Sequence, residues 1–214
     1  MIFLELVPVS IDELKTNSQW AIETHPSITG INVPDILRIK NRSYDAVLPL
    51  ANLSIQSIPH IRICDFSEEQ LYTLCERLLN NGILHILLIS GDPPPNLLQP
   101  VYRHNIIHIL KGLSNTFNTI DFYAGFDPYR QSLKAEYEYA YNKLSAGAKG
   151  LFTQPVFDTH LAHMLLELNL DCNWFIGISP VLTEPSLNYW QTRNNVVFNT
   201  NFTPTYDYNV HTLI

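Results

Sequence analysis

The sequence predicts an α/β fold in which parallel strands alternate with crossover helices. Short apolar runs and segments of helical periodicity follow one another at least six times, with no linker or low-complexity tract between them. The run at 83–90 is almost unbroken apolar sequence, which is typical of a strand buried on both faces of a parallel sheet. This alternation fits either an open doubly wound sheet or a closed (β/α)8 barrel.

Eight strands are expected from apolar or alternating runs that end at glycine, proline or polar residues. They cover residues 2–7, 27–33, 57–65, 83–90, 121–126, 150–154, 174–178 and a last short run at 195–199. The apolar run at 45–53 is a poor candidate for a central strand, because Pro49 has no N–H to donate to a neighbouring strand.

Six helices are expected from capping residues and from apolar side chains spaced three or four apart. Two follow the capping boxes at 10–13 and 67–70, two cover residues 101–113 and 129–146, one follows the cap Asp158, and the last covers 186–193. Gly82 and Gly147 come directly after two of these helices, where glycine commonly ends a helix.

The composition excludes several classes of protein. The 214 residues are enough for one large domain or two small ones, and 46% hydrophobic with 15% charged residues excludes a disordered chain. The net charge of −7, without a basic run, predicts no nucleic acid partner. No apolar run reaches the roughly 20 residues that span a bilayer, and the first ten residues lack signal-peptide features. We therefore expect no membrane association and a cytoplasmic location.

Metal and phosphate motifs are equally scarce. The three cysteines form no CxxC pair, so buried thiols are expected in place of disulfides or a zinc site. His160 and His163 lie on one helical turn, but without further ligands a surface pair is the simpler reading. No GxGxxG or GxxxxGK[ST] loop follows the first strand, which argues against a dinucleotide fingerprint and a P-loop.

Polar residues stand at the ends of most expected strands. They are Glu5, Asn32, Asp65, Asp92, Asp127, Gln154 and Ser179. In a closed barrel the carboxyl ends of the strands meet on one rim, where barrel enzymes place their active sites. Glu5 lies between apolar residues; burial would raise the pKa of its carboxyl and suit it to general acid catalysis, whereas a solvent-facing Glu5 would have no such role. Asp92 follows Gly91 and precedes three prolines, so it is either a rigidly held acid or a simple turn cap.

Five motifs in the right order resemble the methylenetetrahydrofolate reductase family, a flavoprotein (β/α)8 barrel. LELVP at 4–8 resembles the family's FEFFPP strand, and PHIRIC at 59–64 resembles its PHLTC strand. NGI at 81–83 with SGDPP at 90–94 is similar to NGI followed by RGDLPP or TGDPP. AGA at 146–148 with FTQPVFD at 152–158 is similar to AGA with ITQFFFD, and GISP at 177–180 is similar to PGILP.

The resemblance implies a TIM-type barrel over residues 1–214 as a single domain. It implies FAD as cofactor, NAD(P)H as hydride donor, and a folate substrate, 5,10-methylenetetrahydrofolate, reduced to 5-methyltetrahydrofolate in one-carbon and methionine metabolism. By resemblance, Glu5 is the acid that protonates the folate nitrogen, and Asp92 is the anion that stabilises the opened cation. Gln154, Asp92 and Ser179 are implied to bind substrate. The implied cofactor-binding residues are Asn32, His60, Gly91, Asp92, Tyr102, Phe126 and Lys143.

The sequence also departs from the family pattern. Ser90 stands where many relatives have a cofactor-gripping arginine, Asn142 replaces another arginine, and Arg130 takes the place of a histidine. Residues 195–214 predict an absent or rebuilt eighth strand, so the barrel is expected to be incomplete at its carboxyl-terminal end. These departures support an alternative, a divergent member without tight FAD binding that acts as a folate- or partner-binding protein. An unpaired strand edge also predicts a homo-oligomer. A barrel enzyme of unrelated chemistry is the third reading.

Overall fold

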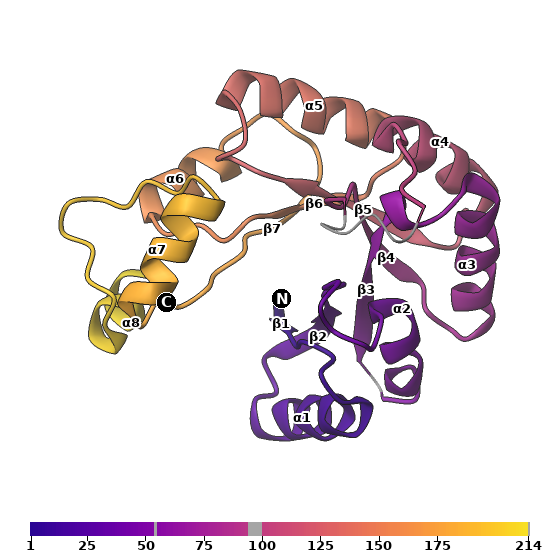
Figure 1. Ribbon diagram of the computed structural model, residues 1–214, viewed down its shortest axis with the longest axis horizontal. Helices are drawn as coiled ribbons and strands as arrows, with labels where there is room; N and C mark the ends of the chain where they lie inside the picture. The colour runs from indigo at the N-terminus through magenta and orange to yellow at the C-terminus, as the bar shows by residue number, and fades with distance from the viewer. Residues whose placement is uncertain (54, 94–99, 214) are drawn as a thin grey trace. The chain divides into compact units, whose positions relative to one another are not determined.

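The computed structural model describes residues 1–53, 55–93 and 100–213 (Figure 1). Seven strands follow one another in a sheet of order β1 to β7, and each pair with a described register is parallel. They are β1 (Ile2–Glu5), β2 (Ile28–Val33), β3 (Gln56–Arg62), β4 (His85–Ile89), β5 (Asp121–Phe126), β6 (Gly150–Thr153) and β7 (Asn173–Phe175). This sequential parallel order is that of a TIM-type barrel, so the predicted α/β class is confirmed. The described residues hold seven of its eight strands.

Eight α-helices accompany the strands in the described residues. They are α1 (Ile11–Thr24), α2 (Ser43–Ala46), α3 (Glu68–Asn80), α4 (Ile106–Thr116), α5 (Leu133–Ser145), α6 (Thr159–Leu166), α7 (Glu184–Arg193) and α8 (Tyr206–Leu213). The predicted capping box at α3 is present: Ser67 Oγ accepts from the Gln70 amide at 3.2 Å, and Gln70 Oε1 accepts from the Ser67 amide at 2.7 Å. Two 3-10 turns, Leu48–Leu50 and Ile63–Asp65, complete the list.

The structure bears out the rejection of 45–53 as a central strand and shifts several of the sequence-based boundaries. The apolar run at 45–53 lies in α2 and the turn Leu48–Leu50, where Pro49 occupies a first-turn position that needs no N–H. The third strand ends at Arg62, since residues 63–65 turn. The helices expected from residues 101 and 129 begin only at 106 and 133, because the preceding residues form the loops that follow β4 and β5.

The carboxyl-terminal prediction of a strand at 195–199 was wrong. Asn195 has a positive φ of 55°, which breaks an extended chain. The residues beyond it fold into helix α8, which sequence periodicity did not indicate. The reason is tertiary: the apolar residues of this stretch pack into a local core with helix α7 and do not pair with a neighbouring strand.

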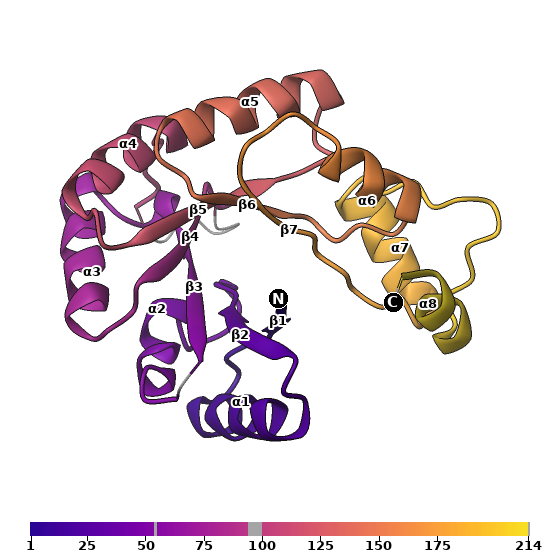
Figure 2. The same ribbon diagram turned by 180° about the vertical axis from the view of Figure 1, so that it is seen from behind.

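The chain forms two compact units, which we describe separately. Unit 1 comprises Met1–Ala124 with Ser145–Ala148, and unit 2 comprises Gly125–Leu144 with Lys149–Ile214. In unit 1, helices α1, α3 and α4 lie on the same side of strands β1 to β4 in both views (Figures 1 and 2). The expectation of one barrel domain over 1–214 stays a prediction.

The two units have different cores. Unit 1 buries aliphatic side chains of its strands and helices, among them Ile31, Ile61, Leu71, Leu78, Ile86 and Leu88. Unit 2 gathers an aromatic cluster from distant segments, comprising Phe157, Val181 and Val196 with Tyr129, Leu187, Trp190, Phe198 and Phe202. Its last helix is fixed by Asn209, which is 2% exposed and whose amide bonds both the N–H and the C=O of Val181 at 2.9 Å.

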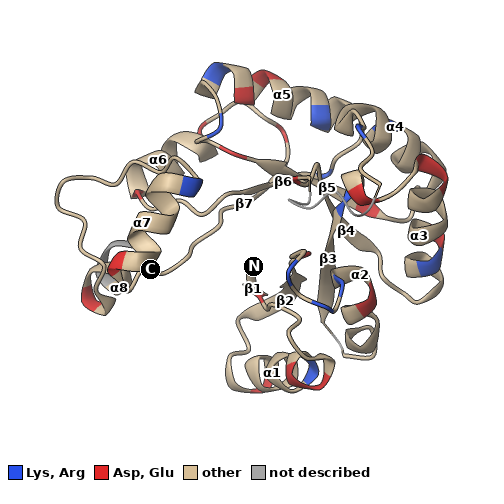
Figure 3. Cartoon of the chain, viewed as in Figure 1, with Lys and Arg blue, Asp and Glu red and all other residues tan. Residues whose placement is uncertain are grey.

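Charged side chains of both signs are interspersed over the helices (Figure 3). This mixture agrees with the absence of a basic run in the sequence. Within the described ranges, none of the helices has the length and apolar character required to cross a membrane.

Candidate functional site

One face of unit 1 carries several of the residues singled out from the sequence. Glu5 is in register with Asn32, and Asn32 is in register with Ile58. Because side chains alternate along a strand, Glu5, Asn32, His60 and Arg62 project from the same face of neighbouring strands β1, β2 and β3. The strand pairing therefore brings an acid, an amide, an imidazole and a guanidinium together in sequence order.

Glu5 is the last residue of β1. Its side chain reaches solvent, yet the protein atoms that crowd the carboxyl exclude enough water to raise its pKa above the ordinary glutamate value. A carboxylic acid that holds its proton closer to neutrality can donate it to a substrate. The solvent-accessible position at the carboxyl end of a strand is compatible with such a role.

Asn32 and His60 present polar atoms that lack protein partners. Both residues are buried, and neither Asn32 Oδ1 nor His60 Nε2 has a hydrogen-bond partner in the described part of the chain. Burial lowers the pKa of His60 to about 4, so the imidazole is neutral near pH 7. Buried polar atoms are nearly always hydrogen-bonded in folded proteins, so such atoms indicate a place for another group.

Gly91 and Asp92 follow β4 directly. Gly91 has a φ of +78°, and a Cβ there would lie 2.6 Å from Cys64 Sγ, so glycine is required on both counts. Asp92 is exposed, and its backbone carbonyl accepts a short hydrogen bond from the Arg62 guanidinium. The predicted proline turn is described only at Pro93, since residues 94–99 lie outside the described ranges.

A charge network that the sequence did not indicate links the ends of β2 and β3. Arg42 bonds Asp35 at 2.8 and 2.6 Å and Asp65 at 2.5 Å, and Arg62 bonds Asp65 at 3.0 Å. Burial acts to raise the pKa of Asp65, but hydrogen bonds from Arg62 and Arg42 hold it below the ordinary value. We call Asp35, Arg42, Arg62 and Asp65 the Asp65 network. Asp65, which stood among the polar strand-end residues, is therefore fully engaged in ion pairs.

Tyr102 lies beside this region of unit 1. Its amide donates to the Cys64 carbonyl at 2.8 Å, and its ring stacks on His104 with the centroids 5.8 Å apart. The hydrogen bond ties the segment before α4 to the turn that follows β3. The Tyr102 residue is only partly buried.

In unit 2, Phe126 and Gln154 lie at the ends of neighbouring strands. The Phe126 carbonyl accepts from the Gln154 amide at 2.9 Å. The Phe126 ring is 1% exposed and packs edge-to-face on Trp174, with centroids 5.2 Å apart. The side chains of Gln154 and Ser179 are half-buried and make no hydrogen bond within the described residues. Both are therefore available to a ligand, whereas Phe126 is enclosed by protein.

Lys143 belongs to a buried cluster around Glu136, a residue that sequence reasoning missed. Glu136 is fully buried and accepts from Arg130 and Gln131 at 2.7 Å and from the Asp127 amide at 3.1 Å. Lys143 Nζ donates to the Gly125 carbonyl at 2.6 Å and lies 3.6 Å from Glu136. Burial lowers the pKa of Lys143 to about 8, although the charge of Glu136 opposes this shift.

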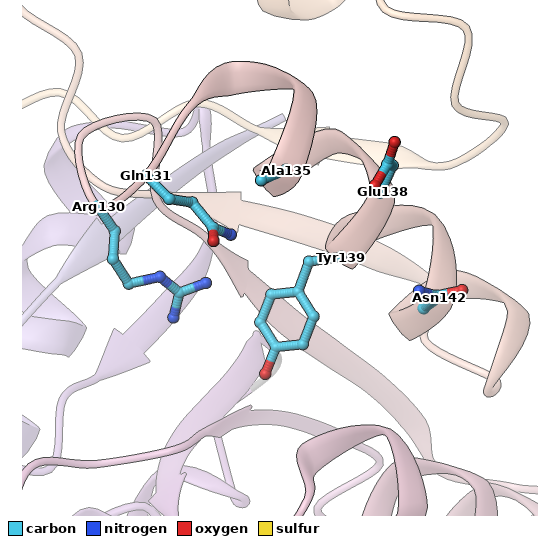
Figure 4. A pocket seen from close by; sticks show the side chains of 6 residues that line it. All are labelled: Arg130, Gln131, Ala135, Glu138, Tyr139 and Asn142. Carbon is cyan, nitrogen blue, oxygen red and sulfur yellow. The ribbon is translucent and has the colours of Figure 1, made fainter.

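An open pocket lies beside this cluster, along α5 and the loop that precedes it (Figure 4). It is lined by Arg130, Gln131, Ala135, Glu138, Tyr139 and Asn142. The Tyr139 ring has the Lys143 Nζ 3.9 Å from its centroid and the Arg130 guanidinium at 5.1 Å. The lining therefore combines an aromatic ring, a half-exposed guanidinium that is paired with Glu136, two amides and the Glu138 carboxylate.

A comparison with models of known protein families identifies the family of this chain. A profile described as methylenetetrahydrofolate reductase matches residues 26–196, which is more than half of the chain. The chain belongs to the methylenetetrahydrofolate reductase family. The match includes His60, Asp92, Lys143 and Gln154, whereas Glu5 precedes it, so the assignment of Glu5 rests on its own strand motif.

Among sequence relatives, the 5,10-methylenetetrahydrofolate reductase of Escherichia coli (strain K12) is 27% identical over 132 residues, covering 59% of this chain and 45% of that protein. The 5,10-methylenetetrahydrofolate reductase of Pectobacterium carotovorum subsp. carotovorum is 26% identical over 147 residues, covering 66% and 49%. The chain therefore spans about half the length of these curated relatives.

Solved structures share the fold at low sequence identity. Oxaloacetate acetylhydrolase in complex with 3,3-difluorooxalacetate matches with a TM-score of 0.62 and 13% identity, over 87% of this chain and 71% of that one. An uncharacterized protein from Clostridium thermocellum that binds two copies of 5-methyl-5,6,7,8-tetrahydrofolic acid matches with a TM-score of 0.54 and 15% identity, over 92% and 63%. These likenesses support the TIM-type fold alone.

Proposed function

We propose that this member of the methylenetetrahydrofolate reductase family reduces 5,10-methylenetetrahydrofolate to 5-methyltetrahydrofolate, with FAD as cofactor and NAD(P)H as hydride donor. One observation carries the proposal. The strand register gathers the motif residues Glu5, Asn32 and His60 on one face of unit 1, and Asn32 and His60 hold buried polar atoms that have no hydrogen-bond partner among the described residues.

Each unit by itself offers groups that suit part of a flavin dinucleotide. In unit 1, Asn32 Oδ1 and His60 Nε2 are free to meet polar atoms of a ligand, and Gly91 leaves the backbone open to close approach. In unit 2, the pocket on α5 offers the Arg130 guanidinium and the Tyr139 ring, which suit a phosphate and a planar base. Arg130 stands where the resemblance places a histidine and Asn142 where it places an arginine, so the pocket lining departs from the family pattern at both positions. Tyr102, Phe126 and Lys143 stay predictions as flavin contacts.

Lys143 and Phe126 already contact other protein groups, which limits the contacts that either side chain could make with a cofactor. Lys143 already donates to Gly125 and pairs with Glu136. Its role toward the cofactor would therefore be indirect, through its contact with the Tyr139 ring and its ion pair with Glu136, which also bonds Arg130. Phe126 is enclosed against Trp174, so its ring would act by packing.

When bound, the flavin supplies the hydride transfer from NAD(P)H to the methylene carbon of the folate. Glu5 protonates the folate nitrogen, because its raised pKa keeps a proton available, and the five-membered ring opens to an iminium cation. Asp92 stabilises that cation with its carboxylate, which makes no hydrogen bond or ion pair within the described residues and so is available to a positive charge. Gln154 and Ser179 donate or accept hydrogen bonds at the pterin.

The wider setting follows from this reaction. The protein would be an oxidoreductase acting on a CH–NH donor in one-carbon metabolism, and would supply the methyl group for methionine synthesis. We further propose a cytoplasmic homo-oligomer with one barrel domain over residues 1–214. Measurement of mass in solution by light scattering tests the oligomer directly, and a monomer at all concentrations would contradict it.

The visible spectrum of the purified protein, before and after incubation with FAD, is the first test. Yellow protein that oxidises NAD(P)H with a quinone, and with the folate substrate, supports the proposal. Glu5→Gln should abolish folate reduction and leave flavin reduction intact, while Glu76→Gln, exposed on α3, serves as the matched control. Colourless protein that binds folate but not FAD would instead support the binding-protein alternative. Loss of both half-reactions in Glu5→Gln would contradict the role of Glu5.

A further inference from the structure

A guanidinium at the end of β3 hydrogen-bonds the backbone just after β4. Arg62, the last residue of β3, has a side chain only 8% exposed, and its Nη2 donates to the carbonyl oxygen of Asp92. The same side chain packs against Gly91, where an added Cβ would lie 3.1 Å from Arg62 Cβ. Asp92 is thus held through its main chain, and its carboxylate makes no hydrogen bond or ion pair within the described residues.

The Arg62 side chain is itself held in place by a carboxylate. Its Nε bonds Asp65 Oδ2 at 3.0 Å and its Nη2 lies 3.4 Å from Asp65 Oδ1, so the fork of the guanidinium is engaged on one side. Asp65 is fixed in turn by Arg42, and Arg42 by Asp35. The Asp65 network therefore leads from the end of β2 to the end of β4, and the Arg42 side chain, 20% exposed, is its most accessible member.

We propose that Arg62 is the positioning residue for Asp92, and that its hydrogen bond to the Asp92 carbonyl holds the backbone from which the Asp92 carboxylate projects. The inference rests on the proposed function in so far as Asp92 acts on the folate cation. It goes beyond that function, because neither the strand motif nor the family resemblance assigns Arg62 any role. The device works because a bond to the carbonyl fixes the backbone while the carboxylate stays free for the reacting cation.

Position matters here more than charge. A displacement of about 1 Å at a catalytic group lowers a rate by roughly a hundredfold. Lysine keeps the positive charge but presents a single ammonium, which cannot bond Asp65 and the Asp92 carbonyl as a planar fork does. Arg62→Lys is therefore expected to slow the folate half-reaction about 10- to 100-fold. Flavin reduction by NAD(P)H should stay within about threefold, because Asp92 has no part in the proposed first half-reaction.

A double-mutant cycle separates positioning from general damage. If Arg62 acts through Asp92, then Arg62→Lys in an Asp92→Asn background should change the folate step less than about threefold. Arg42→Lys is the matched control, since Arg42 contacts Asp65 and Asp35 but not Asp92. It should lower thermal stability and leave the folate step within about threefold. Equal losses from Arg62→Lys in both backgrounds would overturn the proposal.

A second readout needs no substrate or cofactor. The order parameter of the Asp92 amide, measured by ¹⁵N relaxation, should fall from about 0.85 in the wild-type protein to below about 0.6 in Arg62→Lys, and remain high in Arg42→Lys. An unchanged order parameter of the Asp92 amide in Arg62→Lys would refute the proposal that Arg62 restrains the Asp92 backbone. This holds even in a protein that reduces no folate. If Arg62→Lys does not fold, Arg62→Gln, whose amide N–H donor is too short to reach the Asp92 carbonyl, is read in the same two assays with the same expected losses.

Discussion

Acid should destabilise unit 1 through His60. The imidazole is 9% exposed, and its Nε2 has no partner in the described chain. Burial lowers its pKa to about 4 from 6.5, because a charged ring would lose its hydration without gaining an acceptor. The unfolded chain therefore binds a proton between these two values and the folded protein does not. Stability falls as the pH drops from 6.5 toward 4, and below 4 the full cost is present.

The size of the effect follows from the shift. Each unit of difference between the folded and unfolded pKa corresponds to about 1.4 kcal/mol. The pKa of His60 is 6.5 in the unfolded chain and about 4 in the folded protein, and a change from pH 7 to about pH 4.5 covers most of the range between these values. The free energy of unfolding should therefore fall by about 2 kcal/mol over that range on account of His60 alone. For a protein of ordinary stability this is a substantial fraction of the total.

Urea unfolding near pH 7 and near pH 4.5 measures the loss, and His60→Gln should remove it. His163→Gln, on the exposed side of α6, removes a histidine without touching a buried site and should retain the wild-type loss. A proton NMR titration of the imidazole gives the pKa directly. An imidazole that titrates near 6.5 in the folded protein, or a His60→Gln variant with the wild-type pH dependence, would refute the reasoning.

Three further predictions concern the backbone and the buried polar groups. Gly91→Ala should destabilise by about 3 kcal/mol in urea unfolding, and Gly82→Ala, which has the same positive φ but open space around it, by about 1 kcal/mol. The free energy of unfolding of the wild-type protein should rise by about 1 kcal/mol between pH 7 and about pH 9 on account of Lys143. The reason is that the pKa of this ammonium is 10.5 in the unfolded chain and about 8 in the folded protein, so the unfolded chain binds more protons in this range. Lys143→Met should lack this rise. Asn209→Leu should cost about 2 kcal/mol or more, measured by urea unfolding and by proteolysis of the last helix, because both backbone groups of Val181 lose their partner.

Each of these has a result that contradicts it. Equal losses for the two glycine variants would mean that the chain at Gly91 can shift away from Cys64. A Lys143→Met variant that keeps the gain with pH would assign the gain to other groups. Asn188→Leu, an exposed change on α7, is the control for Asn209→Leu; if both variants resist protease equally, the Asn209 bonds do not fix α8.

Much of the order of elements could be predicted from the sequence, because its signals are local. The cap at Ser67 and the apolar run of β4 act over a few residues, and both were found where expected. The run at 45–53 was harder, since proline excludes a strand interior but is tolerated at the start of a helical turn. Helix α8 was missed because it is held by an aromatic cluster and by Asn209, and not by its own periodicity.

Parts of the candidate site could also be predicted. Glu5, Asn32 and His60 were recognised from strand motifs, and the register places them on one face. Glu136 and Arg62 could not be recognised in this way. A glutamate in the middle of a helix and an arginine in a strand carry no local sign of burial, and both are stabilised by partners that the chain supplies from other elements.

The sequence by itself determined the α/β class, the alternation of strands and helices, and the motif residues at the strand ends, since periodicity, caps and glycine stops operate within a turn or a pleat. Only the tertiary structure decided which group each buried charged side chain bonds. Arg42 meets Asp65, Arg62 meets the carbonyl of Asp92, and Lys143 meets Glu136. Two of these three pairs join residues more than twenty positions apart. Long-range pairing depends on strand register and on where a helix packs, and an amino acid's neighbours in the sequence carry no record of either.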